Sequence, residues 1–282
     1  MTVYEGIKGQ KVLTELRINS LAKRWAKTFD PTAGIINFVP RTLYTYPAKI
    51  DFEIFPQEFE ASYLGKFRMK GQKMDIPFEG YIMEKLMLQL AAELNNACIN
   101  GVAAGVPAGT DLLAALFNGI TKIAKLARTG GHTAIPVAGG AYTTANIIGE
   151  FNEMRDSLGG TKEQDKVVAY CSVANGRLYL DAYRAKHQGN DPMLQRDANG
   201  LITAIMMEDG DGWIYPLHGW GTSNFVLMTF EGNFAYAVDD VADYNAFRFK
   251  DQIRSIQFAM DFKVGVEFAF LSTDYVAMND LN

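Results

Sequence analysis

The sequence predicts an elongated α+β fold, and three features of the chain carry that prediction. Residues 256–270 alternate between apolar positions on one parity and mostly polar positions on the other, as in a β-strand with one buried face. Residues 81–100 carry apolar side chains three or four positions apart, as in an amphipathic helix. The helices and strands between these segments follow no βαβ rhythm, so a doubly wound parallel sheet is not expected.

The final strand sets the expected dimensions of the molecule. At ~3.4 Å per residue, residues 256–270 would extend roughly 50 Å, well beyond the strands usual in compact domains. Such a strand needs an apolar partner of similar length, and the helix at 81–100, roughly 30 Å long, is the candidate. Long thin domains are commoner among proteins that tile a surface than among enzymes that enclose a pocket.

Composition bounds the class of protein. A chain of 282 residues with 48% hydrophobic content can bury one large core or two modest ones, and 21% charged residues exclude a mainly disordered polymer. There is no run of about 18 apolar residues and no signal-peptide pattern, so we expect a soluble protein that stays in the cytoplasm where it is made. Cys98 and Cys171 are expected to be core thiols rather than a disulfide.

The first 35 residues lack a sustained apolar period and end in the turn-forming cluster at 30–34, so they are predicted to form an N-terminal arm. The net charge of −5 argues against a protein whose whole surface binds nucleic acid, but this arm offers a local basic patch. A solvated arm with scattered charges fits the pattern equally. The basic residues of the arm are Lys8, Lys11, Arg17, Lys23, Arg24 and Lys27.

Residues 36–78 have a β-like pattern that breaks at Pro56, and their charges are segregated. The pattern predicts an extended β-hairpin whose two strands carry opposite charges and pair with each other or with a neighbouring subunit. Opposite-charge pairs across strands contribute only ~0.2 to 1 kcal/mol each, so we expect them to serve specificity. The acidic residues are Asp51, Glu53, Glu58 and Glu60, and the basic residues are Lys66, Arg68, Lys70 and Lys73.

The helix at 81–100 should stop at Asn100-Gly101, and Thr110 is a candidate cap for a second helix that continues to Ile123. A third helix is expected from Thr143 or Thr144 to Leu158. A buried strand at 167–173 should lead into a short helix that starts at Asn175 or Gly176. Further short strands are predicted at 201–207, 213–217, 225–230 and 234–238.

Searches for chemical motifs find no phosphate-binding loop, dinucleotide fingerprint, nucleophile elbow or zinc-protease helix. The acidic run at 208–212 lacks the further ligands of a calcium loop, so a solvated hairpin turn is expected there. The acidic residues at 239–243 have no metal-ligand spacing either. We therefore predict no enzyme activity, no metal and no cofactor. The three histidines, all in turn-like contexts, are His132, His187 and His218.

The order of these elements resembles that of the major capsid proteins of tailed bacteriophages, which have the Hong Kong 97-like fold. Residues 81–101 are similar to the spine helix of that family, and 116–120 to the short segment after it. Residues 165–183 resemble the strand-and-helix unit of the axial domain. Residues 233–270 resemble the end of the peripheral domain. The resemblance covers nearly the whole chain and rests on the order and spacing of the motifs.

This resemblance implies a shell subunit that assembles through pentamers and hexamers into an icosahedral capsid around double-stranded DNA. It implies assembly in the host cytoplasm, residence in the virion, and portal, scaffolding and decoration proteins as partners, without a membrane. Some relatives carry a long N-terminal scaffolding segment that is absent here, so a separate scaffolding protein or an earlier removal is expected. The implied parts are an arm (1–35), an extended loop (36–78), a peripheral domain (79–135 and 239–282) and an axial domain (136–238).

The resemblance also assigns surfaces. The basic residues of the arm would face DNA inside the shell. The charged residues of the extended loop would contact adjacent subunits, and these are Glu53, Glu58, Glu60, Lys66, Arg68, Lys70 and Lys73.

Two other functions stay open. An encapsulin-like nanocompartment shell shares the fold and roughly this length but encloses a cargo enzyme instead of DNA. From a different class, a hydrolase could use His187 or His218 with Asp191 or Asp211. The size of the purified particle separates the classes, because a 31.3 kDa enzyme would elute as a small oligomer.

Overall fold

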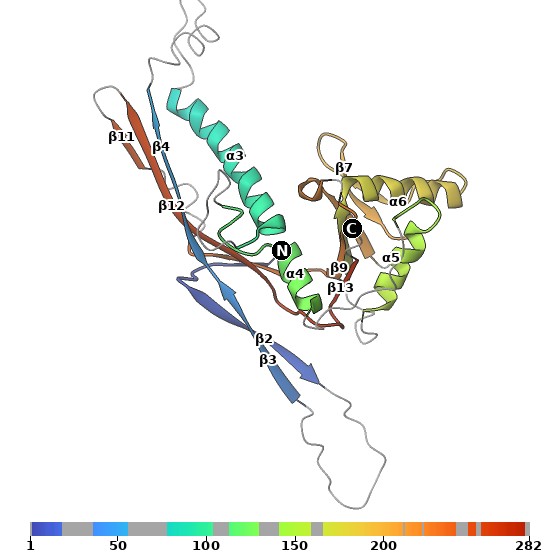
Figure 1. The fold of residues 1–282 in the computed structure, drawn as a ribbon. Coiled ribbons are helices and arrows are strands. Elements are labelled where there is room, and N and C mark those ends of the chain that lie inside the picture. Colours follow the sequence, from blue (N-terminus) through green and yellow to red (C-terminus); the bar gives the residue numbers. More distant parts are fainter. Residues whose placement is uncertain are drawn as a thin grey trace, which may run out of the picture.

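A computed structural model describes residues 2–18, 36–55, 78–103, 113–129, 141–158, 166–210, 212–221, 223–240, 248–251 and 255–279. These residues form two sheets and a two-stranded ribbon that projects from the first sheet (Figure 1). The helices among them are α3 (Phe78–Asn100), α4 (Ile120–Thr129), α5 (Ile147–Asp156), α6 (Val173–Lys186) and the 3-10 helix η3 (His218–Trp220). The strands are β1 (Thr2–Tyr4), β2 (Gln10–Ile18), β3 (Ile36–Tyr44), β4 (Tyr46–Ile54), β5 (Val167–Ser172), β6 (Leu194–Arg196), β7 (Ile202–Met206), β8 (Gly212–Leu217), β9 (Val226–Phe230), β10 (Phe234–Val238), β11 (Arg248–Asp251), β12 (Ile256–Phe268) and β13 (Val276–Asn279).

The long strand β12 is the centre of the first sheet. On one side it pairs antiparallel with β4, from Ile256 opposite Ile54 to Val264 opposite Tyr46. On its other side it pairs antiparallel with β11 and β10, and β1 adds in parallel to the far edge of β10. The predicted strand is confirmed, and it ends two residues early, at Phe268. The even-numbered, apolar side chains of β12 are buried from residue 258 onward. This is the alternation from which the strand was predicted.

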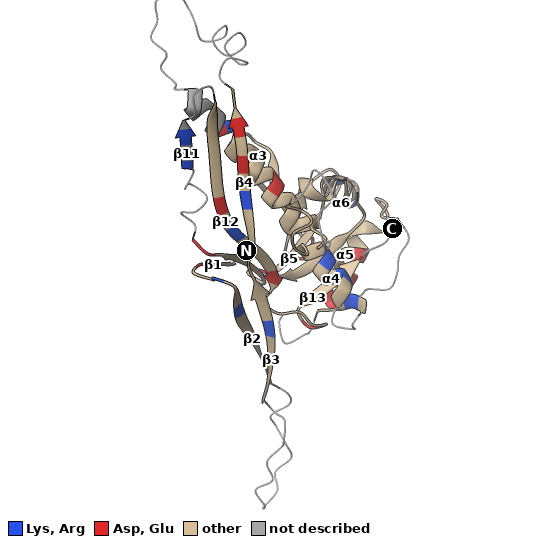
Figure 2. Ribbon diagram, turned by 60° about the vertical axis from the view of Figure 1, so that its left-hand side comes forward, with Lys and Arg blue, Asp and Glu red and all other residues tan. Residues whose placement is uncertain are grey.

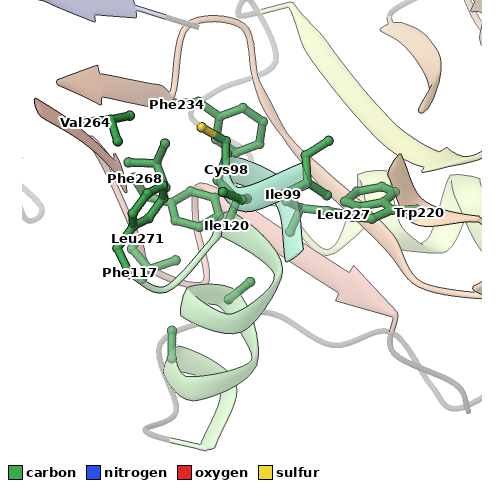
Figure 3. Packing of buried hydrophobic residues seen from close by; sticks show 14 of the residues in the cluster. Cys98, Ile99, Phe117, Ile120, Trp220, Leu227, Phe234, Val264, Phe268 and Leu271 are labelled. Carbon is green, nitrogen blue, oxygen red and sulfur yellow. The ribbon is translucent and has the colours of Figure 1, made fainter. Parts of the chain in front are cut away.

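Helices α3 and α4 cover one face of this sheet (Figure 1 and Figure 2). The buried residues of β12 from Met260 to Phe268 belong to the same hydrophobic core as Leu90 and Cys98 of α3. Figure 3 shows Cys98, Val264 and Phe268 of this core. With 23 residues at ~1.5 Å each, α3 is about 35 Å long and matches the strand that it accompanies. The predicted association of a long helix with a long strand is confirmed. Each large apolar side chain buried there contributes ~1.5 to 3 kcal/mol.

Two Asn-Gly pairs fix the end of α3. A Cβ at Gly101 would meet the Phe117 carbonyl oxygen at 2.6 Å, and one at Gly119 would meet the Gly101 nitrogen at 2.6 Å. The backbones at these two glycines touch, and the Gly119 N–H donates to the Gly101 carbonyl at 2.8 Å. The helix predicted to begin near Thr110 is therefore wrong over 113–119, where 113–116 form turns and 117–119 are irregular, and α4 begins only at Ile120. The cause is a tertiary contact, since a helix that ran through Gly119 could not bring its backbone against that of Gly101.

The second sheet has the strand order β13-β9-β5-β8-β7-β6, and α5 and α6 pack against it. The predicted helix after β5 is confirmed, but it starts at Val173 because the Ser172 hydroxyl accepts from the Asn175 N–H and caps it. The expected third helix is confirmed as α5, which starts at Ile147. Strands β7, β8, β9 and β10 confirm the four predicted short strands.

The chain passes between the sheets more often than predicted. Asn233 stands between β9 in the second sheet and β10 in the first. Its side-chain amide donates to the Phe270 carbonyl at 2.8 Å, and its side-chain oxygen accepts from the Phe270 N–H at 2.7 Å. Later, β13 returns to the second sheet by pairing with β9. Apolar strands such as 234–238 fit either sheet by their sequence pattern, and only tertiary pairing decides which sheet they join.

The extended hairpin also differs from the prediction. β3 pairs with β2, a segment predicted to belong to an arm without its own structure. β4, expected to be in the hairpin, pairs with β12 instead. The projecting ribbon is thus made by residues 10–18 and 36–44, and the basic half of the predicted hairpin lies outside the described residues. A ribbon that projects from the body has no continuous buried face, so β2 carries no strong period for sequence reasoning to detect.

Candidate inter-subunit surfaces

The ribbon of β2 and β3 presents an apolar face to solvent. The two strands pair antiparallel from Gln10 opposite Tyr44 to Ile18 opposite Ile36, which puts Val12, Phe38 and Tyr44 on the same face. These three side chains are 55%, 67% and 49% exposed. Large apolar side chains grouped on a projecting element are typical of a binding surface.

The opposite face of the ribbon is buried where it joins the first sheet. Leu13 and Leu43 pack there with Ile7, on the side of the sheet that faces away from α3. Gly265 of β12 lies directly beneath the base of the ribbon, and a methyl group on it would overlap the carbonyl oxygen of Tyr44. The ribbon base therefore rests on bare backbone, which only glycine provides.

Polar contacts hold the same joint. The Arg41 guanidinium donates to the Glu267 carboxylate at 2.8 Å, and the two side chains are only 23% and 17% exposed. The Thr45 hydroxyl donates to the Ile7 carbonyl at 3.1 Å, and its N–H donates to the Gly9 carbonyl at 2.9 Å. Because the joint combines buried apolar contacts with a shielded ion pair, the direction of the ribbon relative to the sheet is fixed.

On the same side of the sheet, β4 carries an exposed charged face. Lys49 pairs with Asp51 at 2.6 Å, and the Glu53 carboxylate accepts from the Ser255 hydroxyl at 2.5 Å. The Lys49–Asp51 pair raises the pKa of Lys49, chiefly through its hydrogen bond, but both side chains are exposed and the pair adds little stability. A shallow groove of about 640 Å³ opens beside this face, lined in part by Arg248 and Lys263.

Four of the predicted surface residues lie in the described part of the chain: Glu53, predicted to contact adjacent subunits, and Lys8, Lys11 and Arg17 of the arm, predicted to face DNA. Glu53 is on β4, as just described. Lys8 and Lys11 lie at the ribbon base, where the Lys11 ammonium stands 4.2 Å above the Tyr4 ring and the Lys8 carbonyl accepts from Lys263 at 3.4 Å. Arg17 is in β2. The other predicted residues lie outside the described part of the chain, and they are Lys23, Arg24, Lys27, Glu58, Glu60, Lys66, Arg68, Lys70 and Lys73.

The histidines do not assemble a hydrolytic site among the described residues. His187 Nε2 lies 2.8 Å from Glu208, and Asp191 accepts from Arg184 at 2.5 Å, so His187 and Asp191 each have another partner. His218 begins η3, and His132 and Asp211 lie outside the described residues.

The acidic run at 208–210 forms the hairpin turn between β7 and β8, as predicted. The described residues contain no group of three or more side chains that could hold a metal ion. Burial raises the pKa of both cysteine thiols, Cys98 and Cys171, to about 12, which agrees with their prediction as core residues.

Sequence reasoning missed the residues that build the ribbon joint. Arg41 is far in the chain from Gly265 and Glu267, and the three residues match no motif. The charge of Glu267 within the long alternating strand was visible, but its partner depends on which strand crosses β12. The contact of β3 with β12 brings Arg41 to Glu267.

Comparisons with known proteins identify structures of similar fold but no matching sequence family. No protein-family model matches the chain, and no curated protein is similar to it in sequence. Several solved structures are similar over nearly its whole length. The capsid of an empty GTA particle matches with a TM-score of 0.61 and 11% identity, covering 99% of this chain and 87% of that chain. A structure of Mycobacterium phage Adephagia matches with a TM-score of 0.53 and 12% identity, with the same coverage of 99% and 87%.

A third similar structure is the holo-SrpI encapsulin complex from Synechococcus elongatus, with a TM-score of 0.56, 8% identity, and coverage of 99% of this chain and 85% of that chain. At such identities the likeness concerns the fold alone. The chain has the Hong Kong 97-like fold of capsid shells, as the order of its elements implied. None of the described helices combines the length and the apolar character needed to cross a membrane.

Proposed function

We propose that this chain is the major capsid protein of a tailed bacteriophage, which self-assembles through pentamers and hexamers into an icosahedral shell that encloses double-stranded DNA. The observation that carries the proposal is the ribbon, whose apolar face, with Phe38 67% exposed, has no cover within the described part of the subunit. A rigidly mounted apolar projection suits a subunit whose many moderate contacts add up around a closed shell. The similarity to phage and GTA capsid structures supports the same conclusion.

The parts of the fold take family roles under this proposal. The first sheet with α3 and α4 would be the peripheral domain, and the second sheet with α5 and α6 the axial domain. The ribbon of β2 and β3 would serve as the extended loop that contacts adjacent subunits. The predicted contacts of Arg68 and Lys70, and the interior DNA-facing role of the arm residues, remain proposals, as do portal, scaffolding and decoration partners.

The size of the expressed protein tests this function. Purified chain should sediment as capsomers or megadalton shells, visible as closed particles by negative-stain microscopy, because the shell contacts are built into the subunit. A protein that stays a monomer or small oligomer at every concentration, with or without a scaffolding protein, would contradict the proposal. An encapsulin-like compartment is the alternative, and native particles decide it by their content, which is nuclease-protected DNA for a capsid and a cargo protein for a compartment.

A further inference from the structure

The far end of the first sheet carries opposite charges on its two edges. Two rows of residues cross it on the side away from α3, running from β11 through β12 to β4. One row consists of Lys250, Gln257 and Glu53, and the next of Arg248, Ala259 and Asp51. Each row begins with a cation on β11 and ends with a carboxylate on β4, with an uncharged residue between them. Figure 2 shows blue on β11 and red on β4, on either side of β12.

The charges at the ends of these rows are exposed and have few partners among the described residues. In the described residues, Arg248 and Lys250 have no carboxylate partner. Glu53 accepts from the uncharged groups of Ser255 and Gln257, at 2.5 and 3.3 Å, so its negative charge has no paired cation there. Asp51 is matched only by Lys49 in an exposed pair. Within the described chain, β11 and β4 each pair with β12 alone, so both form edges of the sheet.

We propose that the basic edge β11 of one copy contacts the acidic edge β4 of a neighbouring copy in the assembled shell. This inference rests on the proposed capsid function and names one of its contacts. Edge to edge, Lys250 would meet Glu53 of the partner subunit, and Arg248 would meet Asp51 of the partner subunit. The two surfaces differ, so the contact is heterologous, and a heterologous contact repeated by rotation closes a ring of subunits.

A simpler explanation of a charged edge is that it protects the sheet, because lysine and arginine on edge strands prevent uncontrolled pairing with other sheets. The two readings make opposite predictions when the sign of one edge is changed. An acidic β11 protects as well as a basic one, so protection alone leaves assembly unaffected. A complementary contact instead becomes repulsive.

The test uses three variants of the full chain. Arg248→Glu with Lys250→Glu makes both edges acidic, and Asp51→Lys with Glu53→Lys makes both edges basic. The fourfold variant combines all these changes and restores complementarity with reversed polarity. Particle yield is measured by sedimentation and negative-stain microscopy, and thermal unfolding of the unassembled subunit shows that each variant is folded.

Each double variant should lower the yield of closed particles by roughly tenfold or more, since a small loss per contact multiplies around a ring. The fourfold variant should recover most of the yield. The matched control exchanges the cations, Arg248→Lys with Lys250→Arg, and should assemble normally because both charges remain.

The inference is overturned if folded double variants assemble like the parent, or if the fourfold variant assembles no better than they do. That result differs from failure of the proposed function, in which the unaltered chain itself forms no particles. Salt provides a second readout, because raising it from about 0.1 M to about 1 M shortens the screening length from ~10 to ~3 Å and should weaken the contact in the parent protein.

Discussion

At the residue scale, Gly265 is a position where a single added methyl group should destabilise the subunit. Gly265→Ala puts a methyl group against the Tyr44 carbonyl, so either the ribbon base or β12 must move. Overpacking of this kind typically costs ~1 to 3 kcal/mol. We expect the free energy of unfolding to fall by about that amount in a denaturant titration of the unassembled subunit.

Gly149 provides the matched control for this substitution. It lies within α5, and a Cβ there meets nothing within 4 Å. Gly149→Ala should therefore raise the free energy of unfolding by ~0.5 to 1 kcal/mol, as alanine does in an open helical position. Equal effects from the two substitutions would show that the close approach at Gly265 is not what limits that position.

Glu208 should make stability depend on pH at the acid end. Its pKa lies below the ordinary value, chiefly because Lys186 hydrogen-bonds to the carboxylate, with His187 as a further partner. A lowered pKa means that the unfolded chain binds the proton more readily. The stabilisation is thus complete above about pH 4.3, the unfolded value, and is lost as pH falls through the folded value.

The expected result is a difference in melting temperature between the parent protein and Lys186→Met that is present near pH 5 and shrinks toward about pH 3. Thermal unfolding followed by circular dichroism measures it. Because the pair of Lys166 with Glu231 is exposed and long, at 3.8 Å, Lys166→Met serves as a control for which we expect no such dependence. A Lys186→Met difference that is constant over the range would exclude the Glu208 contact as its source.

At the scale of elements, the ribbon separates subunit stability from assembly. Val12 and Phe38 are exposed in the subunit, so Val12→Ser with Phe38→Ser should change its free energy of unfolding by less than about 0.5 kcal/mol. If the apolar face contacts a neighbouring copy, the same variant should lose closed particles in sedimentation, because the lost burial is repeated at every subunit.

Leu43→Ala is the opposite case for the same element. Leu43 is fully buried in the ribbon base, so its truncation should lower the free energy of unfolding by ~2 to 5 kcal/mol. Normal particles from the Val12 and Phe38 variant would show that the exposed face is not an inter-subunit surface, whatever the Leu43 variant does.

The elements that could be predicted are those whose own burial fixes their period. β12 and α3 each bury one face along their length, so the alternation of β12 and the helical spacing of α3 could be recognised in the sequence. Asn100-Gly101 marked the end of the helix. The ribbon could not be predicted because its strands are largely exposed and its pairing joins residues 10–18 to 36–44. The ion pair of Arg41 with Glu267 depends on where the ribbon lies, so it could not be predicted either.

At the scale of the whole molecule, the two sheets are tied together by polar residues at their junction. The Asn100 side chain donates to the Gly219 carbonyl at 2.5 Å, and the Trp220 indole donates to the Thr121 hydroxyl at 3.0 Å. These bonds join α3 and α4 beside the first sheet to η3, which follows β8 of the second. The passage of the chain through Asn233 adds a covalent connection, so the two sheets are joined both by hydrogen bonds and by the chain itself.

The continuity of β3 with β4 has a mechanical consequence. A single residue, Thr45, separates the two strands, so tension applied to the ribbon passes directly into β4 along its axis. The nine residues of β4 pair antiparallel with β12, and a force along the strand axis loads this pairing in shear. In shear the hydrogen bonds resist together instead of opening one after another. Tension on the ribbon would thus be borne by all nine β4–β12 residue pairs together.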